Sequence, residues 1–422
     1  MPDTLSDIVC FELGSGQPPW MGSTDSLNVD REAILRLVDE GVIEVTEKRG
    51  YAYVSGVDRV GFIRLPSGRR LVIRSKIESL VLLEWLGYLG EFPPLEVWMS
   101  EAGVITGDDI HTCLARLFLY ELEKLTRLYL RKDYASIDSS APTIRGRIMT
   151  TQFCRKLHRL PLVPQKLRVR TLETPHNIVL ALALDRLPLL LTISSLEDQT
   201  LLARVRDQWT HIRRDIVDPV SAINEAQWAC PPGYRAGLQL ARLILIGAAI
   251  DPEAGLGGQA FTLSLSSVWE RSLRKMIEEI SSEIGLVPSS VSSRTRQWDD
   301  SAGRNDPNRW LTVDVMATQG VFRWVLDAKY KRAFGNESRE DRFQMCAYAV
   351  AFDADRVSLV YPLAKSSCDR RTLLKTVFGL KHVTIESLNL PMSSGPHLCK
   401  SALIDFVNSQ LVSGKSFLEA QV

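Results

Sequence analysis

A pair of apolar segments, residues 310–317 and 321–330, most constrains how this chain can fold. The turn-forming residues 318–320 separate them, which predicts two strands joined in a tight hairpin. Side chains on a strand alternate between its two faces, so the second segment presents Asp327 and Lys329 side by side. The first six residues of that segment, VFRWVL, are too apolar for an exposed edge. Charges at the end of such a buried strand are costly unless they bind something.

A second carboxylate is expected close to this pair. Asp314, on the first strand, lies within a few positions of facing Asp327 across the hairpin. Mg²⁺ takes a few carboxylate oxygens, keeps several waters and leaves room for a phosphate oxygen. Lys329 could orient a water or neutralise developing charge, although a structural salt bridge would also explain it. The three residues therefore predict a catalytic Mg²⁺ site, in which Mn²⁺ can substitute.

Two predicted helices supply further candidates. In residues 340–352, Gln344 and Tyr348 are spaced i and i+4, so they share a face. They could contact the nucleic-acid backbone or a water on the metal, or simply hydrogen-bond to each other. In residues 267–284, Glu270 falls on the apolar stripe, which predicts a buried carboxylate. It either completes the metal site or sits favourably at the helix N-terminus.

A formal net charge of +1 means that any nucleic-acid surface must come from local clustering of cations. One such cluster exists, because no acidic residue lies between Asp138 and Glu173. It could follow a phosphate backbone or be a solvated face that pairs with acids elsewhere. Its cations are Arg145, Arg147, Arg155, Lys156, Arg159, Lys166, Arg168 and Arg170. We expect the first five of these, together with Lys331, to contact DNA.

Cysteine and histidine spacing excludes other classes of site. The seven cysteines and six histidines are scattered, without C-x-x-C or H-E-x-x-H spacing, which argues against a disulfide framework and a zinc site. The N-terminus lacks a signal-peptide pattern, and no apolar run approaches the ~18 residues of a membrane span. We therefore expect a soluble, cytoplasmic protein without membrane contact.

Periodicity and turn signals predict three regions. Residues 1–105 form a β-rich module with one helix near its start and another near its end. Residues 106–254 carry helical patterns that the basic cluster interrupts, and residues 255–422 hold the predicted metal site. A Gly/Pro-rich segment at 252–258 separates the last two regions. The expected fold class is an α+β N-terminal region followed by an α/β domain.

The motifs around the predicted site resemble the McrC family, the nuclease subunits of modification-dependent restriction systems. They are LTVDV (311–315), VLDAKYKR (325–332), RFQMCAYA (342–349) and VSLVYP (357–362). Their order, after a helix that carries Glu270, is that of the PD-(D/E)xK restriction-endonuclease-like core. Upstream segments also resemble the family: VGFIRLPSGRRLVIRSKI (60–77), TIRGRI (143–148) and HNIVLALAL (176–184). Val313 and Ser75 stand where the family often has proline, and neither change removes a ligand or a charge.

The resemblance implies a DNA-cutting subunit that works with an McrB-like AAA+ GTPase hexamer. In that family the N-terminal region engages the motor and stimulates nucleotide hydrolysis, and translocation triggers cleavage. The chain has no G-x-x-x-x-G-K-[ST] loop of its own, so the motor would be another polypeptide. Two alternatives stay open: a defence or repair nuclease acting alone or with a different ATPase, and a catalytically silent DNA-binding or ring-capping module.

Overall fold

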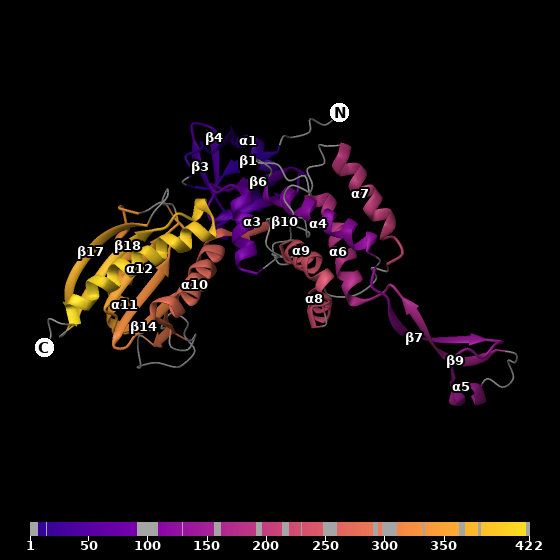
Figure 1. Ribbon diagram of the computed structural model, residues 1–422. Helices are drawn as coiled ribbons and strands as arrows, with labels where there is room; N and C mark the ends of the chain where they lie inside the picture. Colours follow the sequence, from indigo (N-terminus) through magenta and orange to yellow (C-terminus); the bar gives the residue numbers. More distant parts are fainter. Residues whose placement is uncertain are drawn as a thin grey trace. The chain divides into compact units, whose positions relative to one another are not determined.

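The computed structural model is shown in Figure 1. No helix among its described residues is long and apolar enough to cross a membrane. The structure describes the whole chain except residues 1–6, 14, 91–108, 129, 156–161, 191–195, 213–218, 229, 248–259, 290–293, 298–309, 332–333, 363–367, 379–380 and 419–422.

The chain forms two compact units, and both are discontinuous in sequence. The first unit contains residues 1–97, 105–113 and 250–422, and the second contains residues 98–104 and 114–249. The predicted N-terminal module and the predicted nuclease region therefore lie mostly in the same unit. The predicted boundaries at 105 and 254 stay predictions, and the segment 252–258 falls outside the described residues.

The N-terminal part of the first unit contains two small sheets, with strand orders β2-β4-β3 and β1-β6-β5-β10. The β-rich character of this region and its two predicted helices are confirmed, although the first two strands, Ile8–Phe11 and Trp20–Ser23, were not predicted individually. The elements are β1 (Ile8–Phe11), β2 (Trp20–Ser23), α1 (Thr24–Leu27), α2 (Arg31–Asp39), β3 (Ile43–Lys48), β4 (Tyr51–Gly56), β5 (Arg59–Arg64), β6 (Arg70–Arg74) and α3 (Ser79–Tyr88).

Strand β10 (Ala260–Ser264) joins this N-terminal sheet from the C-terminal part of the chain. It pairs antiparallel with β5, so the sheet is incomplete without residues that follow the second unit. Helix α3 also packs on the C-terminal helices. The indole of Trp85 donates to the carbonyl oxygen of Met392 at 2.9 Å and meets Trp269 edge-on. The two parts of the first unit thus share a sheet and a core.

The C-terminal part is built on a six-stranded sheet of order β11-β14-β15-β16-β18-β17. Helix α11 covers the face that carries Val325, and α12 covers the opposite face, where Trp324 meets Phe406. Its elements are α10 (Leu265–Ile284), β11 (Val287–Pro288), β12 (Thr295–Gln297), β13 (Trp310–Thr312), β14 (Val315–Gln319), β15 (Phe322–Ala328), α11 (Arg339–Ala351), β16 (Arg356–Tyr361), β17 (Asp369–Phe378), β18 (Lys381–Asn389) and α12 (Pro396–Leu418).

The second unit is a set of helices with one β-rich extension, which is labelled β7, β9 and α5 in Figure 1. The sequence pattern predicts helices at 114–130, 176–191, 201–216 and 236–249, and helices occur at all four places among the described residues. The third ends at Gln208, earlier than predicted, and the helix Pro219–Trp228 was not predicted. The sheet of order β7-β9-β8 was not predicted, although Leu167 and Val169 alternate with the cations of its middle strand. Helix α4 (Ile110–Arg127) belongs to this unit from Leu114 onward. The other elements are β7 (Asp133–Ala141), β8 (Arg147–Ile148), α5 (Thr150–Arg155), β9 (Val163–Thr171), α6 (Pro175–Leu190), α7 (Leu196–Gln208), α8 (Pro219–Trp228) and α9 (Arg235–Gly247).

We call β7, β8, α5 and β9 the β7–β9 arm. Strands β7 and β9 pair along their whole length, from Asp133 opposite Thr171 to Ala141 opposite Val163. Most side chains of both strands are exposed or half-buried, including Tyr134 (61% exposed) and Ile137 (43%). The arm therefore has little hydrophobic core of its own.

Candidate active site

The hairpin β14–β15 is confirmed, and Gly320 in its turn takes a positive φ of 59°. The segment 310–317, however, is not one strand as predicted. It breaks at Val313 and Asp314, because β13 pairs with β12 in another sheet and the Val313 amide donates to the Arg294 carbonyl. The break places Asp314 just before the pair Val315–Leu326, and its Oδ2 accepts a 2.7 Å hydrogen bond from the Ala328 amide.

Asp327, Lys329, Gln344 and Tyr348 form one hydrogen-bonded network between β15 and α11. The Lys329 ammonium lies 2.7 Å from Asp327 Oδ2 and donates to Gln344 Oε1 at 3.0 Å. The Gln344 amide donates to the Tyr348 hydroxyl at 2.6 Å, and that hydroxyl lies 3.3 Å from Asp327 Oδ1. The two interpretations of Gln344 and Tyr348 are thus not exclusive, since they bond to each other and to the acid–lysine pair.

The two aspartates share a largely buried site in which negative charge is disfavoured. Burial, and then the nearby Asp327 carboxylate, raise the pKa of Asp314 to about 6. Burial also raises the pKa of Asp327, whose side chain is 5% exposed, although the Lys329 ammonium opposes that shift. A cation bound between two such carboxylates would relieve both effects.

The donor set fits Mg²⁺, which often binds proteins through only one or two carboxylates and fills its remaining positions with water and phosphate oxygens. Asp314 and Asp327 supply two carboxylates, and that of Asp327 lies close enough to raise the pKa of Asp314. No group of three or more His, Cys, Asp or Glu side chains suited to a metal occurs within the described part of the chain. A metal held by these two carboxylates would have further coordination positions for water and phosphate oxygens.

Glu270 differs from its prediction. Its side chain is 39% exposed, not buried on the apolar stripe of α10, because it turns to Arg274 and forms an ion pair of 2.6 Å. The carboxylate still lies near enough to contribute to the raised pKa of Asp314. That Glu270 is a third metal ligand stays a prediction.

Two arginines that the sequence did not single out hold the backbone at Asp314. Arg274 and Arg294 both donate to the Asp314 carbonyl oxygen, and Arg294 is 8% exposed. Arg294 belongs to a polar segment without periodicity, so nothing in the sequence marks it. Its contact fixes the backbone that carries a candidate metal ligand.

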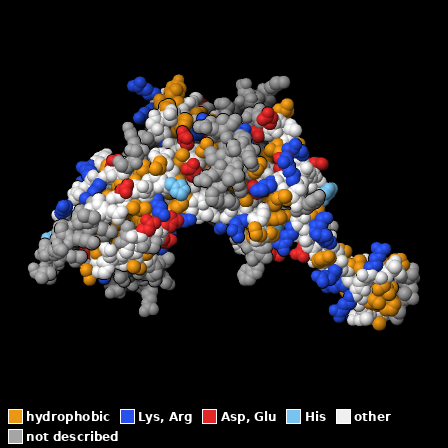
Figure 2. Space-filling view, in the orientation of Figure 1, with side chains coloured by type: hydrophobic (Ala, Val, Ile, Leu, Met, Phe, Trp, Pro, Cys, Tyr) orange, Lys and Arg blue, Asp and Glu red, His pale blue; other side chains and the backbone are white. Residues whose placement is uncertain are grey.

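The predicted DNA-binding residues fall in both units. Arg145, Arg147 and Arg155 belong to the β7–β9 arm, while Lys156 and Arg159 lie outside the described residues. Figure 2 shows Lys and Arg side chains spread along the arm. Lys331 is in the first unit, where its side chain is 44% exposed and pairs with Asp341 at 2.6 Å.

One face of the arm is densely basic. Lys166, Arg168 and Arg170 alternate along β9 and are all exposed, and Arg147 lies directly opposite Lys166 on β8. Like charges placed opposite each other on neighbouring strands repel, so this face favours an anionic partner. Asp138 faces Lys166 on the other side and offsets part of that repulsion.

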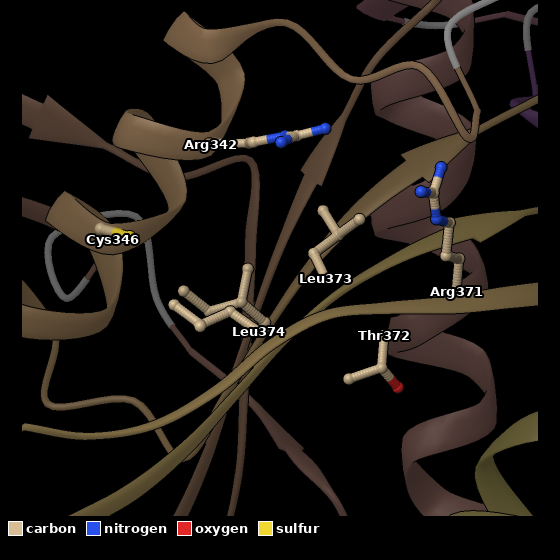
Figure 3. Close-up of a pocket in the computed structure, with 7 residues that line it drawn as sticks. Arg342, Cys346, Arg371, Thr372, Leu373 and Leu374 are labelled. Atoms are coloured by element: carbon tan, nitrogen blue, oxygen red, sulfur yellow. The ribbon is translucent and has the colours of Figure 1, made fainter.

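A pocket lies between helix α11 and strand β17 (Figure 3). It is lined by Arg342 and Cys346 of α11 and by residues 371–374 of the edge strand β17. None of the candidate catalytic residues lines it, so it is not the predicted active site.

Comparison with known proteins gave a family and a fold. The protein family described as "McrBC 5-methylcytosine restriction system component" matches residues 56–362. A chain from a refined half-complex of the tetradecameric assembly of Thermococcus gammatolerans McrB AAA+ hexamers with bound McrC is 13% identical. It covers 95% of this chain and 100% of its own length, with a TM-score of 0.65, so the fold is shared.

A chain from the cryo-EM structure of the Thermococcus gammatolerans McrBC complex is also 13% identical. The match covers 65% of this chain and 86% of that one, with a TM-score of 0.46. No curated protein sequence matches.

Proposed function

Because the chain belongs to the family of McrBC 5-methylcytosine restriction system components, we propose that it is the DNA-cutting subunit of such a system. In this proposal the C-terminal sheet is a PD-(D/E)xK nuclease core that hydrolyses phosphodiester bonds. The observation that carries the proposal is the meeting of Asp314, Asp327 and Lys329 at one end of β15. A purely structural role would not require two acids with raised pKa values beside a lysine.

The residues divide the work as follows. Asp314 and Asp327 would hold Mg²⁺, which would supply charge stabilisation for the phosphate and a lower pKa for a bound water. Lys329 is held 2.7 Å from Asp327 with its side chain 22% exposed, so it can reach a phosphate oxygen or an attacking water. Gln344 and Tyr348 fix the positions of Lys329 and Asp327, so that both are preorganised before DNA arrives.

The proposed partner is an McrB-like AAA+ hexamer. The related chain of shared fold comes from an assembly of McrB AAA+ hexamers with bound McrC, and this sequence has no phosphate-binding loop of its own. We propose that the partner binds and hydrolyses the nucleotide, that this chain stimulates the hydrolysis, and that translocation leads to cleavage.

The β7–β9 arm is the proposed second site of DNA contact. Its exposed cations form one continuous basic face, which suits a phosphate backbone. The competing role for the arm is contact with the motor. The salt dependence of DNA binding distinguishes the two roles, because loss of phosphate contacts lowers it.

Metal dependence tests the proposed function. The full chain is incubated with modified DNA, the motor and its nucleotide, and with Mg²⁺, Mn²⁺, Ca²⁺ or EDTA. We expect cutting with Mg²⁺ and Mn²⁺ but not with Ca²⁺, whose larger and looser coordination positions water poorly. Nucleotide hydrolysis by the motor needs a metal as well, so hydrolysis is measured in the same reactions as cutting. Cutting that persists in EDTA would contradict the proposal.

A further inference from the structure

The sequence motif at 60–77 meets the catalytic motif at a buried cluster formed by Glu12, Lys76 and Tyr330. Lys76 follows β6 and its ammonium lies 2.8 Å from Glu12 Oε1 and 3.9 Å from the centre of the Tyr330 ring. The Tyr330 hydroxyl donates to Glu12 Oε2 at 3.3 Å. Three segments that are distant in sequence therefore converge on one point.

The ion pair in this cluster is almost completely removed from water. The Lys76 side chain is 2% exposed and that of Glu12 is not exposed at all. A buried ion pair is a poor way to gain stability, because desolvation offsets much of the attraction between the charges. The ion pair instead provides positional specificity. The ammonium has to lie beside both the carboxylate and the ring, which restricts where Tyr330 can lie.

Glu12 is fixed to the N-terminal sheet. Its amide donates to the Arg74 carbonyl at 2.9 Å, and the next amide, that of Leu13, donates to the Gly56 carbonyl at 2.7 Å. The Lys76 amide in turn lies 3.4 Å from Glu12 Oε2. The cluster is therefore anchored in the N-terminal part of the first unit, whereas Tyr330 belongs to the catalytic motif.

Tyr330 directly follows the candidate catalytic lysine, at the point where β15 ends. The Lys329 amide donates to the Val360 carbonyl at 2.9 Å, and the strand stops at Ala328. After the Lys329–Val360 hydrogen bond, the position of the backbone depends on the contacts that Tyr330 makes with Glu12 and Lys76. We infer that Glu12 and Lys76 position Tyr330, and through it Lys329, so that the N-terminal module completes the active site. This inference rests on the proposed nuclease function.

The experiment compares the full chain with two variants in the cleavage assay with the motor. Tyr330→Phe removes only the hydroxyl, and the double variant Glu12→Gln/Lys76→Met removes both charges while keeping the side-chain volume. We expect kcat for cleavage to fall roughly 10- to 100-fold, the loss typical of a small misplacement of a catalytic group. The KM for DNA and the stimulation of the motor's hydrolysis should change much less than kcat, because the proposed role of Lys329 lies in the chemical step.

An ion pair in the same unit provides the control; its carboxylate is fully buried and also lies 3.7 Å from Arg356. Arg370 lies 2.7 Å from Glu386, whose side chain is not exposed, on the sheet face away from α11. The control Glu386→Gln/Arg370→Met should lose as much thermal stability as the test double variant but keep wild-type kcat. The inference is overturned if Tyr330→Phe and the test variant cut at the wild-type rate, or if the control loses kcat equally. Failure of the proposed function looks different, since the wild-type chain itself would then not cut.

Discussion

The β14–β15 hairpin and the β7–β9 arm are both antiparallel strand pairs, but they are stabilised in opposite ways. In the hairpin, Val325 and Leu326 on successive positions of β15 are fully buried, because helices cover both faces of the sheet. In the arm, Tyr134 and Ile137 are 61% and 43% exposed. An isolated pair of strands is marginally stable in water, so the arm gains more than the hairpin from a bound partner.

This difference indicates a division of labour. Catalytic groups need to be held within about 0.5 Å, which a strand with a packed core can do. A surface that follows a polymer or a partner protein benefits instead from exposed charge and from the freedom to adapt. The comparison can be tested with variants of the hairpin and of the arm, in which cleavage, stability and DNA binding are each measured.

The largest effect is expected at the end of the hairpin. Asp327→Asn removes a negative charge from the proposed metal site without changing its size, and Lys329→Ala removes the ammonium. Each should lower the cleavage rate by about 10²–10³-fold or more, while DNA binding and stimulation of the motor are retained. Asp353→Asn, at a surface carboxylate that is 65% exposed, is the control and should cut normally. Wild-type cleavage by Asp327→Asn would refute the assignment.

A stability comparison comes next in magnitude. Leu326→Ala in the hairpin should lower the free energy of unfolding by about 2–5 kcal/mol, since it leaves a cavity in a packed core. Ile137→Ala in the arm should change it by less than about 0.5 kcal/mol, because that side chain is largely solvated. Urea titrations of the two variants measure both values. Equal losses would show that the arm has a core of its own.

The third prediction concerns pH and metal binding at Asp314. Its pKa in the folded chain is about 6, above the ordinary 3.8, so the folded state keeps a proton that the unfolded chain releases. Stability from this group is therefore present at low pH and lost as pH rises towards 6. Mg²⁺ should reverse that loss, and raise the melting temperature more at pH 7.5 than at pH 5.

Asp314→Asn is the matched variant for this measurement. It should melt higher than wild type at pH 7.5 without metal, and Mg²⁺ should no longer raise its melting temperature. An equal Mg²⁺ effect on the variant and on wild type would place the metal elsewhere.

The smallest effect per residue is expected in the arm. Replacing Lys166, Arg168 and Arg170 with glutamine should weaken binding to DNA of any sequence. The slope of log K against log salt concentration should fall by about 0.9 for each phosphate that the arm no longer neutralises. Arg36, Lys48 and Arg49, changed together to glutamine, form a control of equal charge outside the arm. Unchanged DNA binding without stimulation of the motor would assign the arm to the partner interface.

The sequence predicted the hairpin and the family well, because both depend on local pattern. Alternation and the turn at 318–320 located β14 and β15, and the match to residues 56–362 confirms the family recognised from the motifs. The arm's strands were missed although Leu167 and Val169 alternate with the cations of β9, because the density of cations was interpreted as a charged surface and not as a strand. Arg294 was missed for another reason: its role depends on a tertiary contact with the Asp314 carbonyl, which no local pattern encodes.

The insertion of residues 114–249 between the parts of one compact unit affects how the protein folds during synthesis. Strand β5 emerges from the ribosome long before its neighbour β10, and Trp85 emerges long before Met392 and Trp269. At 5–20 residues per second, the roughly 200 residues between β5 and β10 take about 10–40 seconds. During that time the nascent chain carries an unpaired strand edge and an uncovered apolar helix, both of which promote aggregation. Production of this protein should therefore depend on chaperones, and on translation speed, more than its finished stability would suggest.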